Sequence, residues 1–310
     1  MIIYGAGMAG LLAANLLRRF KPIVYEAQES LPNNHSALLR FRTPDIGAAC
    51  GVRFKEVDVS KSVFYEGKIF NESNVFLSNQ YSQKVTDAIL NRSIDSLQNS
   101  KRFIAPPNLV EMMAINCKIN YNTTISNSEV GKFDITEPTI STLPMPVMMD
   151  LIGWERKPEF KFKPIWVQRA TIKDPSIDVY QTIYYPDKQL THYRASVIGD
   201  EVIVEHSEEP LVAPGPTIMS ILREDFGIDA MKLDDLKSST QKFGKILPID
   251  ENLRKEFVLK LTKDYNIYSL GRFATWRQVL LDDLVKDIDV IEKFVSGNHS
   301  YNYEIERIDI

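Results

Sequence analysis

The first 26 residues have the order strand, glycine-rich turn, helix, strand and acidic side chain. An apolar strand over residues 1–4 leads into a G-x-G-x-x-G turn, whose glycines are Gly5, Gly7 and Gly10. A helix follows from about Met8, and a second strand over residues 22–25 ends at Glu26. This acid lies 21 residues after the first glycine, near the ~20 expected for a carboxylate that binds a ribose hydroxyl. The segment predicts a dinucleotide-binding βαβ unit.

Each glycine of the turn has its own expected task. Gly5 permits the sharp bend, Gly7 lets a pyrophosphate approach the backbone, and Gly10 lets the helix pack closely on the strand. The first helical residues, Met8 and Ala9, belong to the expected site because a helix N-terminus offers unpaired N–H groups and a partial positive charge to phosphate. The alternative is a glycine-rich turn that binds no ligand.

Composition narrows the class of protein. The chain of 310 residues is 44% hydrophobic and 25% charged, with a net charge of −4. Because it has no basic run, tight binding to nucleic acid is not indicated, although a local patch stays possible. Its two cysteines form no metal-binding pattern, and we expect no metal site. An opening core strand and the lack of an apolar run of ~20 residues predict a cytoplasmic protein without a membrane span. The oligomeric state stays open.

The middle of the chain has a different pattern from its ends. Four segments, at residues 165–172, 179–185, 192–197 and 202–206, have the composition of strands separated by turns, which predicts an antiparallel sheet. Apolar spacing predicts helices over residues 81–98 and 279–295. The α/β signal at both ends indicates a nucleotide-binding domain interrupted by a second domain.

Several sequence strings together resemble one group of flavoproteins. The opening IYGAGMAGLLAANLL…VYE is similar to the FAD-binding unit of glutathione-reductase-like flavoproteins. Residues 139–144, TISTLP, resemble the strand that re-enters the FAD domain in amine oxidases and UDP-galactopyranose mutases. Weaker matches to the mutase-like members are found at residues 183–187, 193–194 and 244–248. Residues 268–276, YSLGRFATW, resemble the closing motif that contacts the flavin.

The resemblance implies an α/β fold, in which a Rossmann-like FAD-binding domain carries an inserted antiparallel β-rich substrate domain. The expected cofactor is FAD, held between the two ends of the chain. The expected FAD-binding domain comprises residues 1–50, 101–155 and 255–310, and the substrate or cap domain comprises residues 51–100 and 156–254. Beyond the opening unit, the expected cofactor contacts are Arg42, Thr142, Gly271, Arg272 and Trp276. Trp276 could equally pack in the core.

Candidates for substrate binding and catalysis are less specific. Arg40 and Arg42 lie near where flavoproteins of this type cover the FAD, although a solvated strand explains them equally well. Arg194, with Tyr184 and Tyr185, could line a pocket on the β-sheet. Lys245 falls where some amine oxidases carry a lysine that holds water near the flavin, and His35 could act as a general base.

Three functions remain from the sequence. The preferred one is an FAD-dependent oxidoreductase that takes a hydride from a C–N or C–O centre, with an amine as the expected substrate. The second is a mutase-like, non-redox flavoenzyme acting on a nucleotide-sugar, in which Arg194 and Arg272 would bind the diphosphate. The third is a non-catalytic nucleotide-binding module. The expected partner is therefore a small-molecule or nucleotide-linked substrate.

Overall fold

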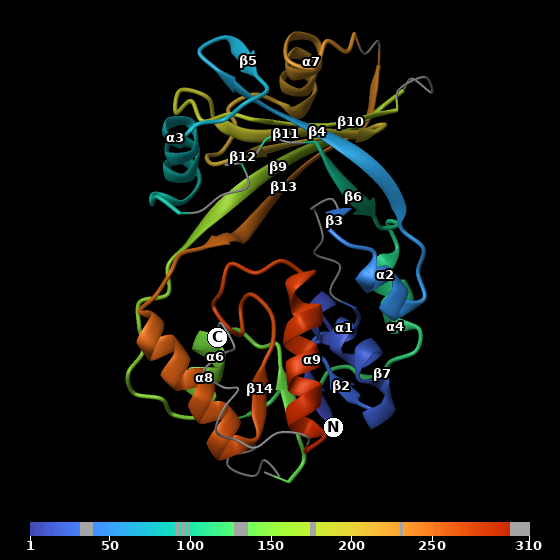
Figure 1. Cartoon of the computed structure of the whole chain (residues 1–310), viewed down its shortest axis with the longest axis vertical. Helices are drawn as coiled ribbons and strands as arrows, with labels where there is room; N and C mark the ends of the chain where they lie inside the picture. The colour runs from blue at the N-terminus through green and yellow to red at the C-terminus, as the bar shows by residue number, and fades with distance from the viewer. Residues whose placement is uncertain are drawn as a thin grey trace.

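Two β-sheets, one above the other, form the body of the protein (Figure 1). The computed structural model describes residues 1–31, 40–90, 94, 97, 99–126, 136–173, 178–229 and 232–297. We call the five-stranded sheet the parallel sheet and the nine-stranded sheet the large sheet. Among the described residues, no helix has both the length and the apolar character needed to cross a membrane.

The parallel sheet is built from segments taken from both ends of the chain. Its strand order is β14 (Ile267–Ser269), β8 (Thr139–Ser141), β1 (Ile2–Tyr4), β2 (Ile23–Tyr25) and β7 (Lys118–Asn120), and every neighbouring pair is parallel. Such short apolar strands suit a sheet that is covered on both faces. The strands at the two ends of the sequence, β1 and β14, are thereby separated only by β8.

Helices cover both faces of the parallel sheet. One face packs against α1 (Met8–Leu16), α2 (Asp45–Cys50), α4 (Leu109–Ala114) and α9 (Asp283–Val295). The other packs against α6 (Met145–Leu151) and α8 (Glu251–Tyr265). A short 3-10 helix, η1 (Arg18–Phe20), follows α1. This arrangement confirms the predicted α/β fold with a Rossmann-like domain.

The four strands predicted for the middle of the chain pair antiparallel with one another, which confirms that prediction, and the large sheet that contains them is mixed. Its main path runs through β13 (Leu233–Ile246), β9 (Phe162–Ile172), β12 (Glu201–His206), β11 (His192–Gly199), β10 (Val179–Tyr184), β4 (Lys55–Tyr65), β6 (Ser100–Ile104) and β3 (Arg40–Phe41), and β5 (Lys68–Phe70) pairs with β4. The pair β4–β10 is parallel. A hairpin forces antiparallel pairing, but these two strands come from distant segments, so no short turn fixes their direction.

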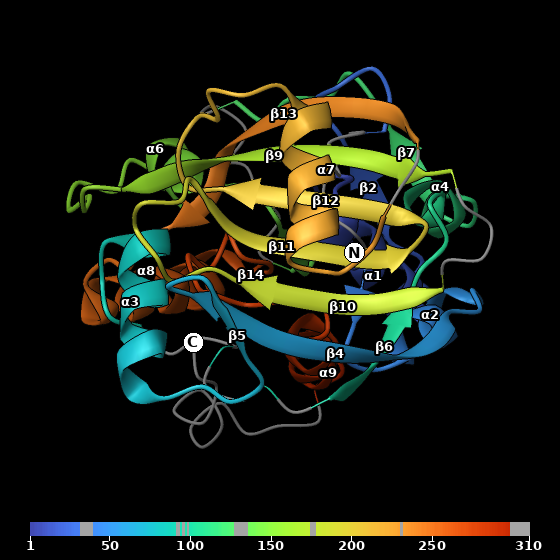
Figure 2. The same ribbon diagram turned by 90° about the horizontal axis from the view of Figure 1, so that it is seen from above.

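Each face of the large sheet has a different cover. Helix α7 (Pro214–Glu224) lies across the outer face (Figure 2), where it packs on apolar side chains of β9 to β12. The inner face is turned toward the parallel sheet, and α3 (Val75–Thr86) packs on one part of it. Because side chains alternate along a strand, residues of even and odd number go to opposite faces.

The structure differs from the sequence predictions at one helix and contains a long strand that the sequence does not predict. The helix expected over residues 81–98 is α3, which begins after Asn74, because the Asn74 side chain accepts a hydrogen bond from the Leu77 amide. Strand β13 was not predicted, since its long polar run lacks an apolar alternation. The short strands β3 and β6, within segments expected to bind FAD, pair with the large sheet. The domain boundaries themselves stay a prediction.

Candidate functional site

The glycine turn follows β1 and leads directly into α1. Gly5 has a φ of +97°, and a Cβ there would collide with Oγ1 of Thr142. A Cβ on Gly10 would collide with the carbonyl oxygen of Gly5. Gly7 differs from both, because its φ of −69° and ψ of 174° suit any residue and a Cβ would meet no atom within 4 Å. The fold requires the first and third glycines, while the second leaves open space above the turn.

The N-terminus of α1 keeps its amides available. No side chain caps the helix, and its first turn carries no acidic residue. An α-helix leaves its first N–H groups without intrahelical partners, and these groups bind phosphate well. Met8 and Ala9 begin this helix, so the structure places them as the sequence predicts, beside the open space over Gly7.

Glu26 fixes the shape of the turn from the end of β2. Its Oε2 accepts a hydrogen bond from the Ala6 amide at 2.7 Å, and its Oε1 accepts one from the Gln28 amide at 3.0 Å. The residue is only 8% exposed. Each carboxylate oxygen keeps a second lone pair, so the side chain can still accept a hydrogen bond from a hydroxyl group.

The closing motif near the C-terminus meets this turn. Gly271 follows β14 with a φ of +97°, and a Cβ there would stand 3.1 Å from the Cβ of Ala9. On the neighbouring strand, Oγ1 of Thr142 donates a hydrogen bond to the carbonyl oxygen of Tyr4 at 2.8 Å. Gly271 and Thr142 therefore lie beside the glycine turn, although the sequence separates all three.

Arg272 joins the two sheets. Its guanidinium donates to the carbonyl oxygens of Phe243 at 2.8 Å and Gly244 at 3.3 Å, both on β13, and lies over the ring of Phe273. Burial lowers the pKa of this arginine. The side chain thus has protein partners of its own, and it ties the carboxyl end of the parallel sheet to the large sheet.

Trp276 packs in the core, and its contact with the cofactor stays a prediction. It is 6% exposed and belongs to the apolar cluster around α6 and α8. Its Nε1 donates to the carbonyl oxygen of Leu247 at 2.9 Å, and Phe160 packs edge-on at 4.6 Å between ring centroids. The residue also borders a cavity of about 350 Å³ that is lined by residues 246–249 and Gln278 among others.

Arg42 is engaged by two carboxylates at the start of α9. Its backbone amide and Nε donate to Asp282 at 3.2–3.3 Å, and its guanidinium pairs with Asp283. Burial acts to lower the pKa of Arg42, but the two acids raise it on balance. This contact holds the end of β3 against the N-terminus of α9.

Three of the four catalytic candidates fall within the described residues, and they do not share one face. On the inner face, Arg194 pairs with Glu205, which also accepts from the Tyr193 hydroxyl at 3.0 Å. The ammonium of Lys245 stands 5.3 Å from the centroid of the Tyr193 ring. Tyr185 instead packs under α7 on the outer face, where its hydroxyl donates to an Asp225 carboxylate oxygen at 2.8 Å.

Arg194 stands opposite Tyr184 and shares its face, whereas Tyr185, one residue later, packs on the other face, so Tyr185 does not line a pocket with Arg194. Its neighbour Tyr184 lies in the inner-face cluster with α3. His35 lies outside the described residues. The described residues contain no group of three or more His, Cys, Asp or Glu side chains that could hold a metal ion.

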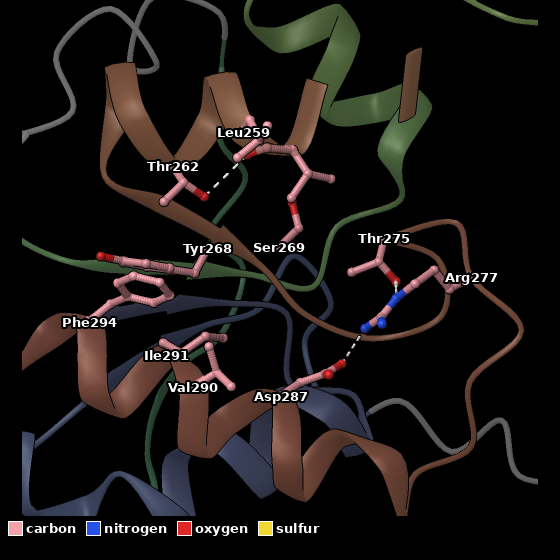
Figure 3. Close-up of a pocket in the computed structure, with 11 residues that line it drawn as sticks. Leu259, Thr262, Tyr268, Ser269, Thr275, Arg277, Asp287, Val290, Ile291 and Phe294 are labelled. Carbon is pink, nitrogen blue, oxygen red and sulfur yellow. Dashed lines mark hydrogen bonds and ion pairs between the residues drawn. The ribbon is translucent and has the colours of Figure 1, made fainter. Parts of the chain in front are cut away.

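A second cavity lies away from the glycine turn, between α8, β14 and α9 (Figure 3). It has a volume of about 60 Å³, and its lining is mostly apolar, with Tyr268 and Phe294 stacked at one side and the Arg277–Asp287 ion pair at another. The cavity is small and mostly apolar, and none of the residues that line it belongs to the glycine turn.

No protein-family model matches the chain, and no curated protein matches it in sequence. Solved structures do match. Reduced UDP-galactopyranose mutase is 14% identical with a TM-score of 0.66, over 98% of this chain and 95% of that one. A probable FAD-dependent monooxygenase from Pseudomonas aeruginosa is 12% identical with a TM-score of 0.54, over 99% and 90%. A flavoprotein/dehydrogenase from Cytophaga hutchinsonii is 13% identical with a TM-score of 0.53, over 98% and 80%.

The chain has the fold of FAD-dependent flavoproteins. This confirms, for the fold, the resemblance seen in the sequence strings. The flavoprotein fold extends over the parallel sheet and the large sheet together, since the matches cover nearly the whole chain.

Proposed function

We propose that this chain binds FAD, with the pyrophosphate on the N-terminus of α1, and acts as an FAD-dependent oxidoreductase on a small molecule. The main support for the proposal is Gly7. Its backbone conformation suits any residue and a Cβ there would meet no protein atom, so the protein itself does not require a glycine at this position. A ligand that lies above the turn would require one. The uncapped amides of α1 and the similarity in fold to FAD-dependent enzymes support the same cofactor.

Bound FAD would accept a hydride from a C–N or C–O centre of the substrate. The chain's own residues bind and orient the cofactor. The α1 amides take the phosphates, Glu26 holds the turn through the Ala6 and Gln28 amides, and Gly271 closes the turn from the other end of the chain. The inner face of the large sheet covers this end of the parallel sheet, which limits access of water to a ligand bound between them.

Oxidation of an amine-type substrate is the more specific proposal. The position of Lys245 supports amine oxidation. This residue lies on the inner face beside Tyr193 and Glu205, close to where Arg272 contacts β13. Burial acts to raise the pKa of Glu205. The Arg194 guanidinium and, to a smaller extent, the Lys245 ammonium lower this pKa on balance. A carboxylate kept ionised in this way can receive a hydrogen bond but cannot donate one.

A mutase-like reaction on a nucleotide-sugar is the second candidate. The match to UDP-galactopyranose mutase, which covers 98% of this chain and 95% of that one, favours it. The predicted diphosphate pair is less suited to the task, because Arg194 is paired with Glu205 and Arg272 donates to carbonyl oxygens of β13. A nucleotide-binding module without catalysis would need neither arginine.

The test begins with the purified full-length protein. We expect flavin absorption bands, and we expect the supernatant after denaturation to contain FAD rather than FMN. Anaerobic addition of an amine should bleach the oxidised flavin, whereas activity with a UDP-sugar that requires dithionite reduction would select the mutase-like reaction. A protein that is colourless, and that gains no flavin absorption on gel filtration after incubation with FAD, would contradict the proposal.

A further inference from the structure

Cationic side chains gather on the inner face of the large sheet, in the part that runs from β11 to β3. They come from different strands: Arg40 from β3, Lys61 from β4, Arg102 from β6 and Arg194 from β11. Figure 1 shows β3 and β6, the last two strands along the large sheet, on the side of that sheet that faces the helices of the parallel sheet. The cluster therefore borders the region between the two sheets.

Strand register brings hydroxyl groups into the same cluster. Lys61 stands opposite Thr182, and Thr182 stands opposite Ser196. The Thr182 and Ser196 hydroxyls lie 2.9 Å apart, and the guanidinium of Arg40 donates to Thr182 Oγ1 at 3.0 Å. Val63, two residues after Lys61, packs in the inner-face apolar cluster, so Lys61 is on the same face.

Positive charge in this cluster exceeds negative charge. Burial and the nearby Arg194 lower the pKa of Arg40 to about 10, and burial, Arg102 and Arg40 lower the pKa of Lys61. Glu205 pairs with Arg194. Within the described part of the chain, no ion pair is formed by Arg40, Lys61 or Arg102. Like charges held together without a counter-charge destabilise a folded protein, and an anion that joins them removes that cost.

We infer that Arg40, Lys61 and Arg102, with the Thr182 hydroxyl, bind a carboxylate or phosphate group of the enzyme's substrate. Guanidinium and ammonium groups beside hydroxyl donors suit the oxygens of either group. The inference rests on the proposed function, in that it takes the region between the sheets to be the substrate site. The substrate is then an acidic small molecule, and an amine-type substrate would carry an acidic group as well.

The experiment measures binding of anions to the full-length protein as purified. Inorganic pyrophosphate and benzoate represent the two chemistries, and each is titrated at constant ionic strength with chloride as the reference salt. Unfolding temperature and, where flavin is bound, the flavin difference spectrum report binding. The test variants are Lys61→Gln and Arg40→Gln. The matched control is Lys101→Gln, since Lys101 precedes Arg102 on β6 but is exposed and paired with Glu56.

We expect saturable binding of at least one anion, and which of the two binds identifies the group. Lys61→Gln and Arg40→Gln should weaken binding at least tenfold, and Lys101→Gln should leave it unchanged. Without anion, Lys61→Gln should unfold at the wild-type temperature or above, because a repulsive charge is removed. A residue with a purely structural role would lower that temperature.

Three outcomes would overturn the inference. These are no saturable binding of either anion to the wild type, equal weakening in Lys101→Gln, and loss of flavin from Lys61→Gln at unchanged stability, which would assign the cluster to the cofactor. Anion binding by a protein that holds no flavin would instead contradict the proposed function and leave the anion site standing. The two hypotheses can therefore fail separately.

Discussion

Gly271, near the C-terminal end of the chain, lies against Ala9 in the first turn of α1: a Cβ on Gly271 would stand 3.1 Å from the Cβ of Ala9. This contact joins the closing motif to the glycine turn. It is possible because β8 alone separates β14 from β1 in the parallel sheet. The candidate cofactor site is thus assembled from both ends of the sequence.

Gly271→Ala should damage both stability and flavin binding. The φ of +97° is unfavourable for any residue with a Cβ, and the added methyl would press on Ala9. We expect a loss of about 1–3 kcal/mol in the free energy of unfolding, measured by urea denaturation, together with reduced FAD content. Gly227→Ala is the matched control, since Gly227 also has a positive φ but has open space around it. Equal losses in the two variants would show that the contact with Ala9 has no effect.

Replacements of Gly7 and Gly10 should have different consequences. Gly7→Val should fold with the wild-type stability of the flavin-free protein but retain no FAD, because the side chain would fill the space left for pyrophosphate. Gly10→Ala should lose stability even without FAD, since its Cβ would collide with the Gly5 carbonyl oxygen. Apoprotein unfolding temperature and flavin content measure the two effects. Wild-type FAD content in Gly7→Val would contradict the proposed position of the pyrophosphate.

Glu26→Gln should loosen the turn. The carboxylate accepts hydrogen bonds from two amides, whereas a carboxamide offers one acceptor oxygen and turns its NH2 group toward the other N–H. We expect a cost of about 1–3 kcal/mol in the free energy of unfolding and weaker FAD retention. Glu29→Gln removes the same charge from an exposed position nearby and should change neither quantity. An unaffected Glu26→Gln variant would show that the turn does not depend on the second acceptor.

The half-buried His192 and the buried His206 should make the protein acid-sensitive. Burial, Lys84 and His206 lower the pKa of His192 to about 3, and burial and Lys84 lower that of His206 to about 4. Between pH 6.5 and about 4 the unfolded chain therefore binds more protons than the folded one, and stability falls as pH falls. Each group contributes at most about 1.4 kcal/mol per pH unit.

The measurement is urea denaturation at several pH values between 7 and 4. His206→Gln should show a shallower loss of stability over this range, because one of the two titrating groups is gone. Its stability at pH 7 can be lower than that of the wild type, so the slope is compared rather than the absolute value. An unchanged slope would show that His206 does not bind a proton on unfolding in this range.

Predictions from local sequence patterns agree best with the structure. The glycine turn, Met8, Ala9 and Glu26 could be placed because a βαβ unit is a continuous segment whose tasks are set by backbone geometry within 26 residues. Gly271 and Thr142 were located through the resemblance, and the structure places them beside that turn. Their binding of FAD stays a prediction, which the variants above test.

The sequence predictions miss features that depend on contacts between distant segments or on the conformation of a single capping residue. Helix α3 ends at Thr86, because its C-cap Asp87 adopts a left-handed conformation, although an apolar residue follows at Ile89, which is exposed. The polar strand β13 forms because it pairs along β9, and its own composition gives no strand signal. Arg42 pairs with Asp282 and Asp283, which depends on where α9 begins, and its contact with the cofactor stays a prediction.

The sequence by itself determined the glycine turn and the place of its acid, since three glycines and an acid at this spacing are a continuous segment with a set backbone geometry. Only the tertiary structure decided which face of the large sheet each polar side chain occupies. It sent Tyr185 under α7 and gathered Arg40, Lys61 and Thr182 on the inner face. The physical reason is that register and strand direction, which alternation converts into opposite faces, are set by pairing between distant segments.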